Sequence, residues 1–447
     1  MSNETTHRSK PAAVASFGPP PSVNPTAAGA GLDTDTLVRS VLFIAACLAV
    51  ATSFRPFPDL SAPPDITDTG DRLNQIGFSL LFLATGAWVF LNKPVRLWPL
   101  LRPTLLVVLV WCGLTVLTSW DPSLAARRLA YALLVMSIAA MLLLLPKNLR
   151  HFADLLAAVA LIVLALCFLG VLFAPNLSIH QASDFVEPDL AGDWRGLFAH
   201  KNEAGAAMAL FIFIGLFVAR ARSAFVGGLI VLLAAVFLIF THSKTALGLL
   251  VPVLLISAII ERCRRPAAGI AIMLSILLVM NLFSVGSLYF ASVRDVLGAL
   301  LPDPSFTGRT DIWQFALDHV AQRPIMGYGF AAFWGTAQVV YGMGGHSIWA
   351  NAAAQAHNSF VNLALTIGVP GSALVAFWLI VLPLVDYYRG AREPMTEPLR
   401  LLLLRICLYG ACASCFESIY FQMGNVWFML LIAVFGLRLL SVARLRT

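Results

Sequence analysis

The chain has 447 residues, of which 59% are hydrophobic and 12% are charged. Soluble globular domains carry roughly a quarter charged residues, so this composition excludes them and predicts a polytopic membrane protein. The formal net charge of +7 would suit a nucleic acid partner, but Lys and Arg occur as short clusters between hydrophobic segments rather than as one stripe, so we expect no nucleic acid partner.

The first 35 residues are rich in Pro, Ala, Ser and Gly and hold few large apolar side chains. Such a segment cannot offset the entropy lost on ordering, which predicts a disordered cytoplasmic tail over residues 1–35. The first hydrophobic segment begins near Leu37 with no clear small-residue cleavage site after it, so we interpret it as a signal anchor.

About twelve segments are long enough to cross a hydrocarbon layer of ~30 Å, which needs about 20 helical residues. The predicted spans are residues 37–54, 73–91, 100–120, 125–145, 151–173, 203–221, 224–242, 244–261, 267–290, 358–385, 399–416 and 425–442. The fold class expected is therefore all-α, with spans one to nine in residues 36–290, a large extracytoplasmic loop in residues 291–357 between spans nine and ten, and the last three spans with a short cytoplasmic tail in residues 358–447.

Charge placement sets the predicted orientation, because Lys and Arg accumulate in short cytoplasmic loops. With both termini inside, every inner loop is basic, from Lys10 and Arg39 to Arg438 and Arg444. The cations left on the outer side depart from this rule and call for an anionic partner, for which a lipid phosphate is the natural candidate. They are Arg127, Arg128, Arg195, Lys201, Lys244, Arg294, Arg309 and Arg323.

The seven cysteines predict no disulfide framework, because they lie in hydrophobic segments or beside predicted cytoplasmic basic residues. Cys412 and Cys415 form a Cys-x-x-Cys pair without a second ligand pair, in a small-residue stretch that favours helix packing.

The long polar passage near residues 295–371 carries three ordered motifs. They are Gly308-Arg309-Thr310-Asp311-Ile312-Trp313, then Arg323-Pro324 followed by Gly327-Tyr328-Gly329-Phe330, then His357-Asn358 with Gly368 and Gly371. An earlier stretch reads Arg195-Gly196-Leu197-Phe198-Ala199-His200-Lys201-Asn202. This ordered set resembles the O-antigen ligase and exopolysaccharide polymerase superfamily, and the earlier stretch is most similar to its exopolysaccharide polymerase members.

The resemblance implies a GT-C-like membrane glycosyltransferase of the bacterial inner membrane, with a periplasmic site and a glycan donor linked to undecaprenyl pyrophosphate. It assigns Arg195 and Arg309 to the pyrophosphate, since a guanidinium binds phosphate oxygens through two parallel hydrogen bonds. Either arginine could instead serve its own loop, Arg195 by pairing with a carboxylate and Arg309 by pairing with Asp311 or capping a helix. Lys201, Lys244 and Arg323 are further candidates, with lipid headgroup contact or a structural role as the alternative.

The acceptor hydroxyl needs a base, and histidine has an unperturbed pKa of ~6.5 near operating pH. His357 leads because it enters a predicted helix and matches the catalytic histidine of the family by its spacing to Gly368 and Gly371. Asn358 could cap that helix or orient the imidazole. His200, Asn202 and Asp311 are supporting candidates, although His200 and His242 could equally anchor helices. His180, His319 and His346 are expected in loops without a supporting pattern.

Residues 311–320 place apolar side chains at 312, 315, 316 and 320, which predicts an amphipathic helix on the membrane plane or over the site. The aromatic residues of this passage could stack on sugars or form an interfacial belt, namely Trp313, Tyr328, Phe330, Trp334 and Trp349. Gly368 to Gly371 predict a kink and close helix approach. The glycines at 327, 329 and 342–345 could hinge a lid or simply form turns.

The leading interpretation is polymerisation of undecaprenyl-pyrophosphate-linked repeat units of an exopolysaccharide, inverting and without metal or other cofactor. The expected partners are the lipid-linked donor, a glycan or lipid-linked acceptor, membrane lipids and, as a further candidate, a chain-length regulator. The first alternative is an O-antigen ligase that transfers glycan to lipid A-core. A flippase or transporter is the alternative from another class, although polar chemistry concentrated in one outer loop disfavours it.

Overall fold

The computed structural model describes residues 33–62, 71–92, 94–300, 306, 308–336, 339, 353–390, 395–422 and 424–444. Over these residues the backbone is helical apart from loops and an isolated bridge between Ile179 and Trp194, which confirms the predicted all-α class. The prediction of a disordered tail falls almost wholly outside this part of the chain, since α1 already begins at Thr34.

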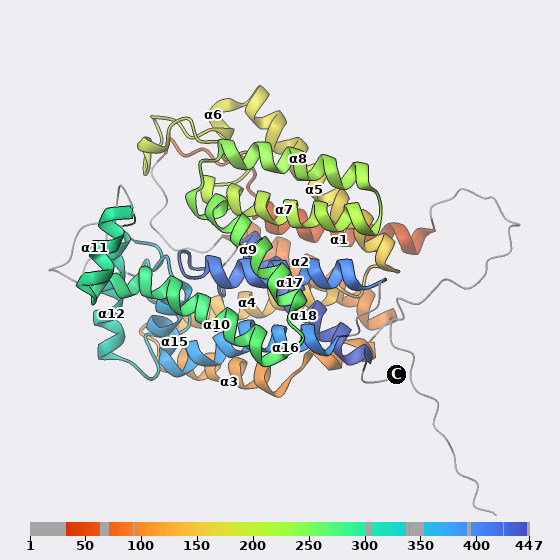
Figure 1. Ribbon diagram of the computed structural model, residues 1–447. Coiled ribbons are helices and arrows are strands. Elements are labelled where there is room, and N and C mark those ends of the chain that lie inside the picture. Colours follow the sequence, from red (N-terminus) through yellow and green to blue (C-terminus); the bar gives the residue numbers. More distant parts are fainter. Residues whose placement is uncertain are drawn as a thin grey trace, which may run out of the picture.

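Figure 1 shows the helices running side by side across the molecule, with α11 and α12 at its left end. The long helices and their short companions are α1 (Thr34–Thr52), α2 (Arg72–Asn92), α3 (Pro103–Leu117), α4 (Pro122–Leu142), α5 (Leu149–Phe173), α6 (Pro175–Ser178), α7 (Lys201–Ala221), α8 (Ala224–Phe240), α9 (Lys244–Arg262), α10 (Pro266–Phe283), α11 (Ala291–Leu300), α12 (Arg309–Gln322), α15 (Ser359–Ala376), α16 (Leu382–Arg389), α17 (Glu397–Ala413) and α18 (Asn425–Arg444). Four one- or two-turn elements join them: η1 (Pro94–Leu100), η2 (Pro188–Leu190), η3 (Val285–Leu288) and η4 (Phe377–Val381).

Each predicted span coincides with a helix, and nine helices of the described chain are long and apolar enough to cross a membrane. The other three predicted spans fall on α3, α8 and α17, of 15, 17 and 17 residues. α3 and α8 are apolar but short, and α17 contains Glu397, Arg400 and Arg405. The protein is therefore a multi-pass membrane protein, and the full count of twelve stays a prediction.

Helix starts follow the local sequence. The side chain of Asn148 accepts a hydrogen bond from the backbone N–H of His151, and the side chain of Asp121 accepts one from the backbone N–H of Leu124. Proline occupies the first turn of α3, α4 and α10. A side-chain oxygen at this position satisfies an amide that has no partner inside the helix, and proline has no amide to satisfy. The short loops between spans can thus end one helix and start the next within a few residues.

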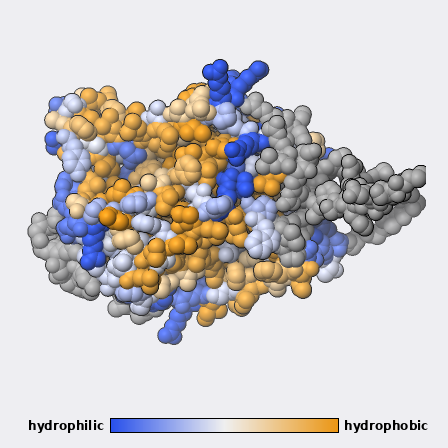
Figure 2. All heavy atoms as spheres, turned by 90° about the horizontal axis from the view of Figure 1, so that it is seen from below, coloured by the Kyte–Doolittle hydropathy of each residue, from blue (hydrophilic) through white to orange (hydrophobic). Residues whose placement is uncertain are grey.

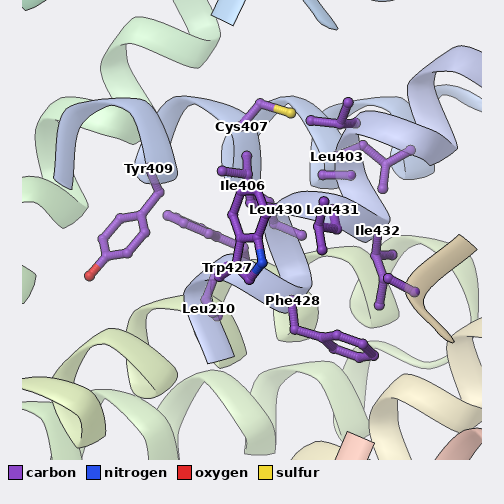
Figure 3. Packing of buried hydrophobic residues seen from close by; sticks show 14 of the residues in the cluster. Leu210, Leu403, Ile406, Cys407, Tyr409, Trp427, Phe428, Leu430, Leu431 and Ile432 are labelled. Atoms are coloured by element: carbon purple, nitrogen blue, oxygen red, sulfur yellow. The ribbon is translucent and has the colours of Figure 1, made fainter. Parts of the chain in front are cut away.

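The helix α17 lies at the centre of the bundle, where it packs against α18, α7 and α9. Figure 3 shows Ile406 and Tyr409 of α17 close to Trp427 of α18 and Leu210 of α7, and all four side chains are at most 3% exposed. From Ile406 to Ala413 every residue of α17 is buried, and a helix segment that is apolar on all sides belongs inside a bundle. This central position explains why α17 is short yet well covered.

The outer surface of the bundle is apolar. Figure 2 shows hydrophobic residues over most of the middle of one face, and Val107, Val110 and Leu278 are at least half exposed. An apolar surface of this extent is not stable in water, so it fits contact with lipid chains.

One end of the bundle gathers the basic residues predicted to be cytoplasmic, and we call it the basic end. Asp386 at the end of α16 is 1% exposed and lies 2.6 Å from Arg102 and 3.8 Å from Arg438. A hydrogen bond from Ser441 to the same carboxylate oxygen ties α18 to this cluster. The ion pair of Lys147 with Asp33 and that of Arg222 with Asp154 join further helix ends there.

The opposite end, which we call the site end, is shaped by a kink in α15. Gly368 has φ +76°, and a Cβ atom built there would lie 1.8 Å from the carbonyl oxygen of Ile325. The turn 324–329 docks onto this kink, with Tyr328 N–H donating to Leu365 O at 2.9 Å and Val369 N–H donating to Pro324 O at 2.8 Å. The expected kink and close approach are confirmed, and they explain the glycine spacing because no larger residue fits Gly368.

The predicted amphipathic helix is α12, and all four of its expected apolar positions, residues 312, 315, 316 and 320, are buried. These side chains pack with Tyr328, Phe333 and Trp334 beside α15. His319 lies in this helix, so its expected place in a loop is wrong: its ring is buried and Nδ1 lies 2.7 Å from Phe315 O. The prediction of a helix over residues 311–320 already included His319, so the helix prediction is the one that holds.

Candidate active site

Three ionisable side chains from three distant segments meet at the site end. The carboxylate of Glu417, in the loop after α17, lies 3.0 Å from His357 Nδ1 through Oε2 and 2.8 Å from Arg309 through Oε1. Arg309 also donates to the carbonyl oxygen of Phe416. Arg309 opens α12 and His357 precedes α15, so Glu417 joins two of the sequence motifs.

The segment that holds His357 is fixed by hydrogen bonds to the Glu417 loop. Asn358 caps α15 by accepting from the amides of Phe360 and Val361, while its Nδ2 donates to Asn281 and to Cys415 O, each at 3.0 Å. Ser359 Oγ donates to Glu417 O at 2.9 Å and accepts from the amide of Ile419 at 2.8 Å. Asn358 thus caps α15, one of the two roles considered for it, and these hydrogen bonds hold the two segments together.

The electrostatics of Glu417 follow from this arrangement. Burial alone would raise the pKa of its carboxyl, but the hydrogen bond from His357 and the charge of Arg309 outweigh burial and lower the pKa to about 2. An ionised carboxylate only accepts hydrogen bonds, so the proton in this contact sits on His357 Nδ1. In the neutral imidazole that carries this proton, Nε2 is the acceptor, and the side chain is 29% exposed.

A second charged cluster surrounds the start of α7. His200 Nδ1 accepts from the amide of Asn202, capping the helix, and His200 Nε2 lies 3.1 Å from Glu187. Asp193 lies 2.5 Å from Lys201 Nζ and 2.6 Å from His242 Nδ1. Burial would raise the pKa of Asp193, but hydrogen bonds from Lys201 and His242 outweigh it, so the pKa is lowered.

Further contacts make this second cluster rigid. His180, which is 2% exposed, places Nδ1 2.8 Å from Asp184 and accepts at Nε2 from the amide of Lys201 at 3.3 Å. The rings of His180 and His200 meet edge to face with centroids 5.4 Å apart. Ser243 donates to Asn202 Oδ1 at 3.0 Å, which fixes the start of α9 to α7.

The two clusters are electrostatic neighbours. The hydrogen bond with His200 lowers the pKa of Glu187, and the charges of His180 and His357 act in the same direction. Glu203 and Glu417 are close enough for their charges to repel. The stretch 195–202 and the segment that carries His357 and Glu417 are thus close enough for their charges to interact, and their joint role in one site stays a prediction.

Arg195 occupies a different environment from the one its predicted role requires. Its side chain is 0% exposed, and it donates to Phe198 O at 3.0 Å and to Pro58 O at 2.8 Å. Its Nε atom has no hydrogen-bond partner among the described residues. In this structure Arg195 holds the loop under the second cluster, and its contact with a pyrophosphate stays a prediction.

The remaining cationic candidates lie outside the two clusters. The guanidinium of Arg323 sits 5.0 Å from the ring centroid of Tyr328 and 5.6 Å from that of Trp120, which supports the structural alternative for it. Lys244 is exposed at the start of α9 and makes no ion pair within the described ranges. Asp311 is exposed in the first turn of α12, where a carboxylate favours the helix dipole.

Most of the aromatic candidates are packed into the protein. Trp313, Tyr328, Phe330 and Trp334 are at most 5% exposed, and Trp313 donates to Ala356 O at 2.9 Å. Trp349, His346 and the glycines at 342–345 lie outside the described residues. Among the residues that are described, no group of three or more His, Cys, Asp or Glu side chains has the arrangement of a metal site.

The fold and these clusters define the class: a multi-pass membrane protein whose chemistry-bearing side chains meet at one end of the helix bundle. Residues 206–376 match the Wzy_C family, described as O-Antigen ligase, and this confirms the resemblance of the motifs. The match contains Arg309 and His357 but neither the 195–202 stretch nor Glu417. This family is of glycosyltransferase type, and its members are expected to be bacterial membrane proteins.

A curated relative is the exopolysaccharide production protein ExoQ of Rhizobium meliloti (strain 1021). It is 28% identical over 200 residues, which cover 41% of this chain and 45% of that protein. The chain thus aligns with less than half the length of this relative.

Proposed function

We propose that this protein polymerises undecaprenyl-pyrophosphate-linked repeat units of an exopolysaccharide in the bacterial inner membrane. The observation that carries the proposal is the bridge of Glu417 between His357 and Arg309, a base beside a cation that can hold a leaving group. The similarity to an exopolysaccharide production protein supports the polymerase over other reactions of the family. The site end then faces the periplasm, and the basic end with both termini faces the cytoplasm.

His357 acts as the general base in this mechanism. Its Nδ1–H donates to Glu417, so Nε2 is the nitrogen that accepts the proton of the acceptor hydroxyl. Glu417, with a pKa of about 2, is too weak a base to take that proton itself. It acts as a positioning residue that fixes the imidazole and stabilises the imidazolium that forms.

Arg309 holds the pyrophosphate. A guanidinium has five N–H donors, and two of its nitrogens contact Phe416 O and Glu417, so donors remain for phosphate oxygens. Lys201 of the second cluster and Lys244, which lies outside the clusters at the start of α9, add positive charge at the site end. We place Arg323 and Arg195 in structural support of the site.

The reaction balances without a further reagent. The acceptor oxygen forms a bond to C1 of the donor sugar as the bond from C1 to the pyrophosphate oxygen breaks. The leaving pyrophosphate takes the bonding electron pair, and the hydroxyl proton passes to His357 Nε2. Attack opposite the leaving group inverts the anomeric centre, and the arginine supplies the charge stabilisation that a metal ion would otherwise give.

The description of the matched family favours one alternative, an O-antigen ligase that transfers the glycan to lipid A-core. The two functions separate when the full-length protein in nanodiscs receives the lipid-linked repeat unit alone or with lipid A-core. Growth of a glycan ladder without the core supports the polymerase. Product that forms only when the core is added, and is attached to it, would show a ligase.

A further inference from the structure

A cavity of about 450 Å³ opens at the site end between α4, α15, α18 and the segment 330–335. Its volume lies toward the smaller end of the range of roughly 300–1,000 Å³ that small-molecule sites occupy. The two clusters described above contribute none of its described lining residues. The mechanism proposed above therefore leaves this cavity without a role.

The cavity has aromatic walls. Phe330, Trp334 and Trp427 line it and are at most 5% exposed, and Phe421 lies edge to face with Phe330 at 5.2 Å between ring centroids. Aromatic faces of this kind stack on the C–H faces of sugar rings, which are apolar on one side. The aromatic set by itself is equally compatible with an acyl chain.

The polar side chains of the wall decide between these occupants. Asn362 is 4% exposed; its Oδ1 accepts from Trp334 Nε1 at 2.8 Å, whereas its Nδ2 has no partner among the described residues. The side-chain amide of Gln422 and the hydroxyl of Tyr131 also make no hydrogen bond to the described part of the protein. An acyl chain would leave these groups unpaired, whereas sugar hydroxyls both donate and accept.

The cavity lies close to the base. Asn362 follows the cap of α15 by four residues, which is roughly 6 Å along a helix axis at 1.5 Å per residue. Phe421 and Gln422 belong to the same loop as Glu417. A group in the cavity can thus be part of a glycan whose hydroxyl reaches His357.

The two charged clusters and the cavity differ in character. Arg309, His200 and Lys201 of the clusters supply cations that suit a pyrophosphate, each beside a carboxylate that it pairs with. The cavity instead combines aromatic rings with uncharged hydrogen-bonding groups, and Arg128 is its charged lining residue. This difference assigns the donor pyrophosphate to the clusters and a sugar to the cavity.

We propose that the cavity lined by Tyr131, Asn362, Gln422 and the surrounding aromatic rings binds the terminal sugar of the acceptor glycan. Binding there presents the next hydroxyl to His357 and makes the enzyme select its acceptor by that sugar. This inference rests on the proposed function, because it names the acceptor site of the same reaction.

The test uses the full-length protein in detergent and the oligosaccharide obtained by partial hydrolysis of the host strain's exopolysaccharide, free of any lipid carrier. Calorimetric titration should show that wild type binds this oligosaccharide and does not bind a maltooligosaccharide of similar size. Tyr131→Phe and Gln422→Ala remove one polar group each and keep the aromatic packing, so each should weaken binding roughly three- to tenfold. Gln314→Ala, an exposed amide change on α12, should leave binding unchanged.

Turnover supplies the second readout. Tyr131→Phe and Gln422→Ala should raise KM for the acceptor while KM for the lipid-linked donor stays at the wild-type value. Absence of binding to wild type, or pocket variants that bind and turn over like Gln314→Ala, would overturn the acceptor site. If His357→Ala and wild type both bind the oligosaccharide but wild type never transfers glycan from the lipid-linked donor, the sugar site stands and the proposed function fails.

Discussion

Replacing Glu417 with Gln removes the charge that links His357 to Arg309 while it keeps the size of the side chain. Against the effect of burial, the hydrogen bond from His357 and the charge of Arg309 lower the pKa of Glu417 from the ordinary 4.5 to about 2. At 1.36 kcal/mol per unit this is roughly 3 kcal/mol of net stabilisation of the ionised carboxylate. The side chain is 21% exposed, so we take this figure as an upper value for the loss of folding free energy.

The effect on turnover should be larger than the effect on folding. A general base contributes about 10²–10⁴ to a rate, and an imidazole without its carboxylate loses the required tautomer and orientation. We therefore expect Glu417→Gln to lower kcat by about 10²-fold or more. The double variant Glu417→Gln/His357→Ala should be no slower than His357→Ala, because the two residues act as one unit.

The assay is release of undecaprenyl pyrophosphate from a lipid-linked repeat unit by protein in nanodiscs, with thermal unfolding measured in parallel. Glu397→Gln is the matched control, since Glu397 is exposed at the other end of α17 and makes no ion pair to the described residues. Full activity of Glu417→Gln, or losses that simply multiply in the double variant, would refute the positioning role.

Three further predictions concern folding and pH. Gly368→Ala should fail to fold or unfold at a much lower temperature, because the backbone there is left-handed and the Cβ atom would overlap Ile325 O. The control Gly248→Ala, whose Cβ atom meets nothing within 4 Å, should melt at or above the wild-type temperature. Equal melting temperatures of the two variants would contradict the role given to the kink. Asp386→Ala should destabilise the protein by about 3–5 kcal/mol by leaving Arg102 unpaired, and Asp386→Ala/Arg102→Ala should recover part of that loss in the same denaturation assay. Because the folded-state pKa of Glu417 is lowered, the stability that this carboxylate contributes is complete above about pH 5 and is lost as the pH falls toward 2. The unfolding temperature of wild type should therefore fall more steeply across this window than that of Glu417→Gln. Parallel curves for the two proteins would contradict this prediction.

The length of the hydrophobic segments was sufficient to locate the spanning helices, because each span must satisfy its own backbone hydrogen bonds and cover one bilayer thickness. The helix α11, inside the predicted outer loop, was not predicted. The turn 324–329 and the kink at Gly368 were also readable, since glycine and proline restrict the local backbone directly. Length alone does not decide whether α17 crosses the membrane, because a short helix inside a bundle does not need the full length of a lipid-facing one.

Glu417 was missed because nothing local marks it. It lies 60 residues after His357 and 108 after Arg309, in a segment that continues an apolar span. A carboxylate at the outer end of a span is costly unless it is paired, and this cost was the available signal. The environment of Arg195 could not be predicted either, because its burial depends on the distant residue Pro58.

The most direct test of the account is a single time course with the purified full-length protein in nanodiscs, an undecaprenyl-pyrophosphate-linked repeat unit and EDTA. Wild type should lengthen the glycan and release undecaprenyl pyrophosphate in step, while His357→Ala and Arg309→Ala, folded by thermal unfolding, should do neither. Normal turnover by His357→Ala, or a wild-type reaction that EDTA abolishes, would contradict the mechanism proposed for this site.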